Sequence, residues 1–156
     1  MNIELIRNHR TRWALDGELR IGGQKICDTS ENLMHHLVQG TYSILIDRCH
    51  HYRRKMPIVL LDESSKVGPL NPFEPLNPRC HSCKKKSIGS QHANLPCYCP
   101  QIKIGNGVAN RTDGSIIIGQ LRLPGLMLKS SDHYDRLIDR LDKAAQRGES
   151  ITLTIK

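Results

Sequence analysis

The hydrophobic positions of this chain gather towards its two ends, and many fall into short alternating runs. Such a run over residues 2–7 predicts a first β-strand, and residues 16–21 and 24–28 flank the pair Gly22-Gly23. Because two glycines tolerate the positive φ angles of a tight turn, these two segments predict a β-hairpin. Similar patterns and β-branched composition predict further strands at residues 41–48, 57–61, 102–104, 115–119 and 151–155.

One amphipathic helix is predicted from Ser131 onward. Ser131 is a suitable N-cap, Asp132 complements the positive end of the helix dipole, and Gly148 can end the helix in a left-handed conformation. A shorter helical turn is predicted within residues 31–39. The apolar residues of the long helix recur at helical spacing on one face, namely Tyr134, Leu137, Ile138, Leu141, Ala144 and Ala145.

The composition limits the architecture. The chain has 156 residues, which is the length of one domain with a single core, so we expect residues 1–156 to form one domain. Aromatic residues make up only 4%, so Ile, Leu and Val must build the core, and the two ends that hold them are expected to meet in space. The predicted class is α+β, with mainly antiparallel β-strands, one C-terminal amphipathic helix and a Cys-rich loop insertion.

The predicted insertion spans residues 62–100, where prolines and cysteines replace the apolar periodicity. A loop approaching this length is uncommon in a compact domain unless something orders it. Cys80 and Cys83 form a C-x-x-C pair, and Cys97 and Cys99 form a C-x-C pair. Four thiolates suit a tetrahedral structural zinc site, whose negative charge the neighbouring lysines 84–86 would offset.

Other states of these cysteines are open. His81 or His92 could replace one thiolate, the four thiols could form two disulfides in an oxidising compartment, or they could remain free. Cys27, on a predicted strand, and Cys49, at a strand end, are instead expected to be small buried hydrophobic residues.

The charge points to anionic partners. A formal net charge of +8 favours nucleic acid, anionic lipid or acidic wall polymers. The densest basic run, residues 48–55, contains Arg53 and Arg54 and suits either phosphate binding or a solvated hairpin tip, and with lysines 84–86 it defines a possible nucleic-acid-binding module. No helix-turn-helix or RNA-recognition motif accompanies it.

The expected location follows from hydropathy. No apolar run reaches 18 residues, and the first residues lack the apolar core of a secretory signal. We therefore expect no transmembrane segment and synthesis in the cytoplasm, which is equally compatible with a virion or secretion-system association.

A glycine-rich stretch, IKIGNGVANRTDGSIIIG at residues 102–119, joins two predicted strands through turn-forming residues. It resembles the DUF5675 family of phage-type and bacterial proteins, whose pattern is approximately I-H-x-G-N followed by D-T-x-G-C-I-x-x-G. The resemblance extends, in order, over LDGEL at residues 15–19 with Cys27, Thr29 and Glu31, over QGTY at residues 39–42, and over the Ser-Ser start of the late helix.

The resemblance implies a site with altered chemistry. The family's His…Gly-Cys arrangement is similar to the active-site strand of L,D-transpeptidases, in which a thiolate attacks an acyl donor and a histidine handles the proton. Here Lys103 stands in place of that histidine and Ser115 in place of that cysteine. The resemblance thus favours a catalytically inactive structural or interaction protein in a phage, secretion-system or cell-wall context.

Two other hypotheses use the same stretch. Lys103 and Ser115 could form a Ser-Lys pair that acts on peptidoglycan, because a desolvated lysine can serve as a base. A groove formed by this glycine-rich stretch could also bind a protein or an anionic polymer without catalysis, through Asn106, Arg111 and Asp113 as polar contacts.

Overall fold

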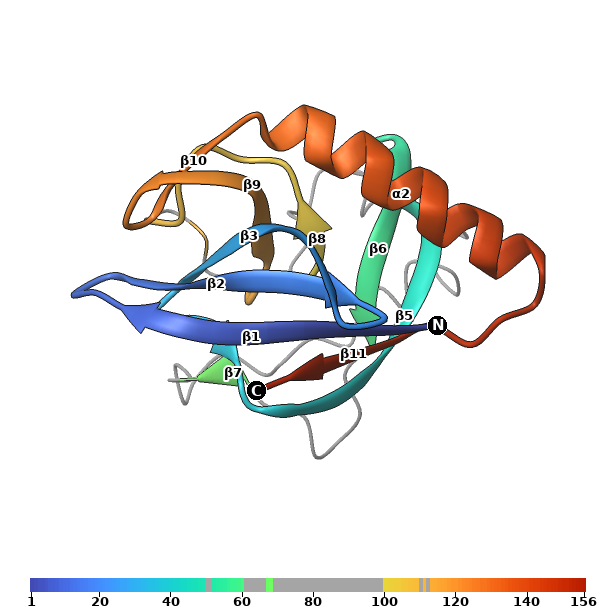
Figure 1. Cartoon of the computed structure of the whole chain (residues 1–156), viewed down its shortest axis with the longest axis horizontal. Coiled ribbons are helices and arrows are strands. Elements are labelled where there is room, and N and C mark those ends of the chain that lie inside the picture. Colours follow the sequence, from blue (N-terminus) through green and yellow to red (C-terminus); the bar gives the residue numbers. More distant parts are fainter. Residues whose placement is uncertain (50–51, 61–66, 69–99, 110, 112) are drawn as a thin grey trace, which may run out of the picture.

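The computed structural model describes residues 1–49, 52–60, 67–68, 100–109, 111 and 113–156. Within them β-strands dominate and one α-helix follows late in the chain (Figure 1). The elements are β1 (Asn2–Arg10), β2 (Ala14–Ile21), β3 (Gln24–Asn32), β4 (His36–Leu37), β5 (Gly40–Cys49), β6 (Arg54–Leu60), β7 (Val67–Gly68), β8 (Ile102–Lys103), β9 (Ile116–Leu123), β10 (Leu126–Leu128), α2 (Ser130–Gln146) and β11 (Thr152–Ile155).

The main sheet has the strand order β10-β9-β3-β2-β1-β11-β5-β6. Most neighbours are antiparallel, but β1 and β11 pair in parallel, with Ile3 opposite Leu153 and Leu5 opposite Ile155. The expectation that the two ends of the chain meet is therefore confirmed, and the last strand lies between β1 and β5 (Figure 1).

The sheet curls until its two ends are joined. β8 pairs in parallel with β9, and just before β8 the backbone of Gln101 bridges to Ile58 of β6. Val59 N donates to Pro100 O at 2.9 Å, which strengthens this junction. β9, β3, β2, β1, β11, β5, β6 and β8 thus surround a common interior, while β10 continues beyond β9.

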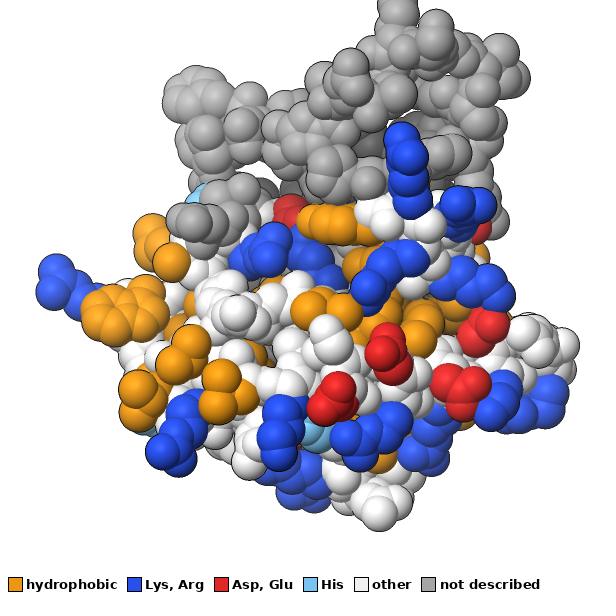
Figure 2. All heavy atoms as spheres, turned by 90° about the horizontal axis from the view of Figure 1, so that it is seen from above, with side chains coloured by type: hydrophobic (Ala, Val, Ile, Leu, Met, Phe, Trp, Pro, Cys, Tyr) orange, Lys and Arg blue, Asp and Glu red, His pale blue; other side chains and the backbone are white. Residues whose placement is uncertain are grey.

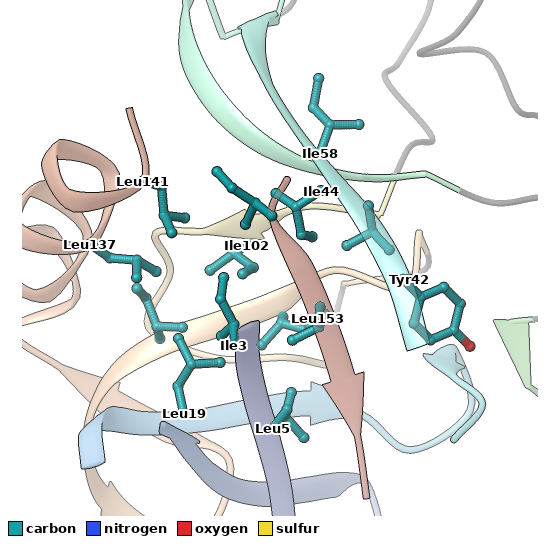
Figure 3. Packing of buried hydrophobic residues seen from close by; sticks show 14 of the residues in the cluster. Ile3, Leu5, Leu19, Tyr42, Ile44, Ile58, Ile102, Leu137, Leu141 and Leu153 are labelled. Atoms are coloured by element: carbon teal, nitrogen blue, oxygen red, sulfur yellow. The ribbon is translucent and has the colours of Figure 1, made fainter. Parts of the chain in front are cut away.

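The core is aliphatic, as the composition predicts. Side chains from β1, β2, β5, β6 and β11 converge there, and Leu137 and Leu141 of α2 pack against them (Figure 3). Tyr134 is the aromatic member contributed by the helix, and its hydroxyl donates to Lys55 O at 2.9 Å. A smaller cluster lies beside β9 and consists of Ala14, Val108, Ile117 and Met127.

The hairpin at Gly22-Gly23 is confirmed. Both glycines have positive φ angles, 59° and 78°, and β2 and β3 pair in antiparallel fashion on either side. The strands are longer than predicted, since β1 extends to Arg10 and β3 to Asn32.

The helical turn predicted within residues 31–39 is wrong. Glu31 and Asn32 complete β3, and the short strand β4 follows a turn. Glu31 is held in the sheet by Arg7, whose Nε and Nη2 each donate to its carboxylate at 2.8 Å. This pairing with β1 outweighs the local helical preference.

The predicted cap of α2 is also wrong. The N-cap residue is Lys129, in a left-handed conformation with φ of 52° and no side-chain hydrogen bond, so Ser131 lies inside the first turn. The predicted end is confirmed, because Gly148 has a φ of 73° and Glu149 N donates to Ala144 O at 3.1 Å.

Candidate functional site

The glycine-rich stretch contains the crossing loop, which connects the parallel strands β8 and β9. β8 and β9 pair with Ile102 opposite Ile116 and Lys103 opposite Ile117, so residues 104–115 must travel back to the start of β9. Since successive residues of a strand face opposite sides, Ile102 enters the core and Lys103 lies on the outer side of the sheet.

Lys103 is buried and charge-paired. Only 4% of its side chain is exposed, and its Nζ lies 2.5 Å from Oδ2 of Asp113. The Nζ atom also lies 5.5 Å from the ring centroid of Tyr52, within the range of a cation–π contact. The two candidates Lys103 and Asp113 are therefore brought together, but as partners of each other.

Ser115 is held by the same network. Its Oγ accepts a hydrogen bond from Gln101 N at 3.1 Å, and its own N–H donates to Oδ1 of Asp113 at 3.0 Å. The residue is 1% exposed. We call Lys103, Asp113, Ser115 and Gln101 the β8–β9 latch, because their contacts join the two ends of the crossing loop.

Asn106 and Arg111 lie outside the latch. Asn106 is exposed and its carbonyl accepts from Met127 N at 2.9 Å, which ties the loop to β10. Arg111 N donates to Val108 O at 2.9 Å within a turn. In the described structure, no hydrogen bond or ion pair joins Asn106 or Arg111 to Asp113.

Two polar residues of this region were not predicted. Gln101 supplies the backbone donor for Ser115, and its Nε2 lies 3.6 Å from Sγ of Cys49. Ser130 Oγ accepts from Gly105 N at 3.1 Å and donates to Ile118 O at 2.5 Å. The Ser-Ser pair correctly indicated the start of the helix. No sequence signal indicated that Ser130 Oγ would bond to Gly105 and Ile118.

Part of the basic run is engaged within the protein. The Arg54 guanidinium lies 4.4 Å from the ring centroid of Tyr134, and Lys55 Nζ donates to both carboxylate oxygens of Asp142 at 2.8 Å. Arg53 has a positive φ of 53° at the turn before β6. Lysines 84–86, the other half of the predicted nucleic-acid-binding module, lie outside the described residues.

Cys27 and Cys49 are buried, as predicted. Burial raises the pKa of Cys27 to about 12, so its thiol stays neutral at ordinary pH. The part of the chain that the structure describes contains no group of three or more His, Cys, Asp or Glu side chains that could hold a metal ion. The predicted zinc ligands Cys80, Cys83, Cys97 and Cys99, and the alternatives His81 and His92, lie outside it.

Comparison with protein-family models, with curated proteins and with solved structures found no match to this chain. Among the described residues, no helix combines the length and hydropathy needed to cross a membrane.

Proposed function

We propose that this chain is a non-catalytic interaction protein of a DUF5675-like type, in which the former catalytic positions serve to hold the fold. The observation that carries the proposal is the β8–β9 latch. Lys103 and Ser115, the two residues on which an enzyme would depend, are each bonded to another residue of the latch.

The ion pair leaves Lys103 without a basic function. A lysine that activates serine must be neutral and must accept the hydroxyl proton. Lys103 instead faces the carboxylate of Asp113 at 2.5 Å, and an ammonium group is a donor without an acceptor site. Lys103 and Ser115 are not joined by a hydrogen bond or an ion pair in the described structure, which supports a structural role for both residues.

Access supports the same conclusion for Ser115. With 1% of the residue exposed, an acyl donor has no approach to Oγ. The hydroxyl already accepts the Gln101 N–H, which lowers its availability as a nucleophile. Both residues are explained by the stability of the crossing loop.

The charge of the surface supports a binding role. The net charge of +8 favours an acidic protein or an anionic polymer as partner. The resemblance of residues 102–119 to the DUF5675 pattern supports a phage, secretion-system or cell-wall context for that partner.

The test is covalent labelling of the full chain. We expect no adduct on Ser115 after incubation with a fluorophosphonate, a β-lactam or peptidoglycan fragments, as followed by intact mass and peptide mapping. Ser115→Ala is the matched control, and apart from the missing oxygen atom it should show the same absence of adducts as the natural chain. An adduct mapped to Ser115, absent from Ser115→Ala, would overturn the proposal in favour of the Ser-Lys enzyme.

A further inference from the structure

Two neighbouring hairpin tips carry exposed apolar side chains. Trp13 lies in the turn between β1 and β2, and Leu123 and Leu126 lie at the ends of β9 and β10. Their exposed fractions are 56%, 61% and 38%, and Leu128 of β10 is 45% exposed. We call these four residues the hairpin-tip patch.

The fold fixes the two tips against each other. Gly125, in the turn between β9 and β10, lies against the indole of Trp13, so that a Cβ added there would be 3.6 Å from Cδ1 and Nε1. Gly125 N also donates to both carboxylate oxygens of the fully buried Asp16 in β2, at 3.1 and 3.2 Å. Ser30 Oγ holds the same carboxylate at 2.6 Å. The patch is therefore a preformed surface rather than two independent loops.

Cationic side chains accompany the patch in the sequence, and we call them its cationic rim. Arg10, Arg12, Arg122 and Lys129 are all exposed, and each lies within three positions of a patch residue in the chain. Figure 2 shows hydrophobic side chains and Lys or Arg side chains together at the left end of the molecule. The β1–β2 and β9–β10 tips lie at the same end in Figure 1. The acidic side chains visible in this view lie elsewhere on the face (Figure 2).

The charge of the rim selects among the possible occupants. A second copy docking by two-fold symmetry would bring two cationic rims together, which is unfavourable. Nucleic acid would pair with the arginines and stack on Trp13, but it would leave Leu123, Leu126 and Leu128 exposed to water. An anionic lipid surface satisfies both kinds of group, because indole and leucine side chains enter the headgroup boundary while arginines meet lipid phosphates.

We propose that the hairpin-tip patch docks this protein on anionic lipid bilayers. Trp13 and Leu123 enter the interface, and Arg12 and Arg122 bind headgroup phosphates beside them. The inference goes beyond the proposed function, which names an acidic protein or an anionic polymer as partner, and it rests on that function only in treating the chain as an interaction protein. The two tests are separate, since an adduct on Ser115 says nothing about the hairpin tips and a failure to bind vesicles leaves the latch unchanged.

Trp13 is the only tryptophan of the chain, so its fluorescence reports on the patch directly. We expect a blue shift of the emission when the full chain is mixed with vesicles of equal parts phosphatidylglycerol and phosphatidylcholine, and quenching when the lipids are brominated in the acyl chains. Vesicles of phosphatidylcholine alone, or high salt, should remove most of the shift. Absence of a shift with the anionic vesicles would overturn the proposal.

Variants assign the effect to residues. Leu123→Asp keeps the reporter and changes a side chain that is 61% exposed, and we expect it to lower the partition coefficient about tenfold or more. Arg12→Ala and Arg122→Ala should each lower it about fivefold, whereas Arg140→Ala, an exposed position on α2, is the matched control and should lower it less. Equal losses in Arg122→Ala and Arg140→Ala would overturn the assigned surface.

The competing occupants have their own signatures. A blue shift that depends on protein concentration without lipid would identify a second copy as the occupant. Quenching by a DNA duplex without any response to vesicles would identify nucleic acid. Either result would overturn the lipid proposal.

Discussion

At the scale of single residues, the buried charges in the described part of the chain each lie beside a bonding partner. Glu31 is 1% exposed and accepts two bonds from Arg7, while Asp16 is fully buried and accepts from Ser30 Oγ and Gly125 N. Removing one member of such a set leaves a buried charge without compensation, which costs far more than the net worth of the pair. Lys103 belongs to this class, because it is buried and paired with Asp113.

The substitution Lys103→Met tests this role. It keeps most of the side-chain volume and leaves Asp113, whose side chain is 11% exposed, without its cation. We expect the free energy of unfolding to fall by about 3 kcal/mol, measured by urea denaturation. Lys143→Met is the matched control, since that lysine is 63% exposed and pairs with Asp139 on the surface of α2. It should change stability by about 0.5 kcal/mol or less.

The double variant Lys103→Met/Asp113→Asn separates a broken pair from lost packing. If the charge left on Asp113 is the cause, the double variant should lose less stability than the two single variants together. A Lys103→Met variant as stable as Lys143→Met would instead show that the latch contributes little to the fold.

At the scale of elements, the features that depend on local backbone conformation were the ones that the sequence predicted correctly. The Gly22-Gly23 hairpin and the end of α2 at Gly148 depend on positive φ angles that glycine favours, and both were predicted correctly. The start of α2 was predicted with Ser131 as the cap, whereas Lys129 in a left-handed conformation is the N-cap and the helix begins at Ser130, whose Oγ bonds to Ile118 O of β9 and to Gly105 N. A contact between distant elements has no local sequence signature.

In the candidate site, too, local features could be predicted and contacts between distant residues could not. The turn-forming residues and the positions of Lys103, Asp113 and Ser115 on or beside two strands could be predicted from the sequence. Their bonding could not, because Gln101 reaches Ser115 only through the parallel pairing of β8 with β9. The change from a possible Ser-Lys pair to a Lys-Asp pair is thus a consequence of the register.

The predicted insertion at residues 62–100 carries a prediction that rests on cysteine spacing alone. If Cys80, Cys83, Cys97 and Cys99 hold structural zinc, the untagged chain should contain about one zinc per molecule, and chelation should free the four thiols. The measurements are metal analysis and a thiol count under denaturing conditions. Cys83→Ser should lose the metal, while Cys27→Ala, which changes a buried thiol in β3, should keep it.

Two other results are distinguishable in the same experiment. No metal with four thiols missing would indicate disulfides and an oxidising destination. No metal with six free thiols would contradict the predicted zinc site. Neither result would affect the β8–β9 latch, whose members lie outside residues 62–100.

At the scale of the whole molecule, the closed sheet makes distant parts of the chain depend on one another. β11 is the last strand in sequence, yet it lies between β1 and β5 in the sheet, and Leu153 pairs with Ile3 on one side and Tyr42 on the other. A destabilised β11 should therefore weaken both arcs of the sheet, namely β1, β2 and β3 on one side and β5 and β6 on the other. Such a sheet is expected to open as one cooperative unit.

Leu153→Ala tests this cooperativity. Leu153 is fully buried, so we expect a loss of about 3 kcal/mol in the free energy of unfolding. Cys27 in β3 and Cys49 at the end of β5 serve as reporters, since both thiols are buried and burial holds the pKa of Cys27 at about 12, which keeps the reactive thiolate absent in the folded state.

Thiol labelling followed by peptide mapping then distinguishes global from local opening. In Leu153→Ala both cysteines should become labelled faster, and by similar factors, because the free energy that protects them is that of the whole sheet. Faster labelling of Cys49 alone would mean that β5 and β6 open while β1, β2 and β3 stay folded. In that case the junction of β6 with Gln101 would be too weak to couple the two arcs, and the sheet would behave as an open one.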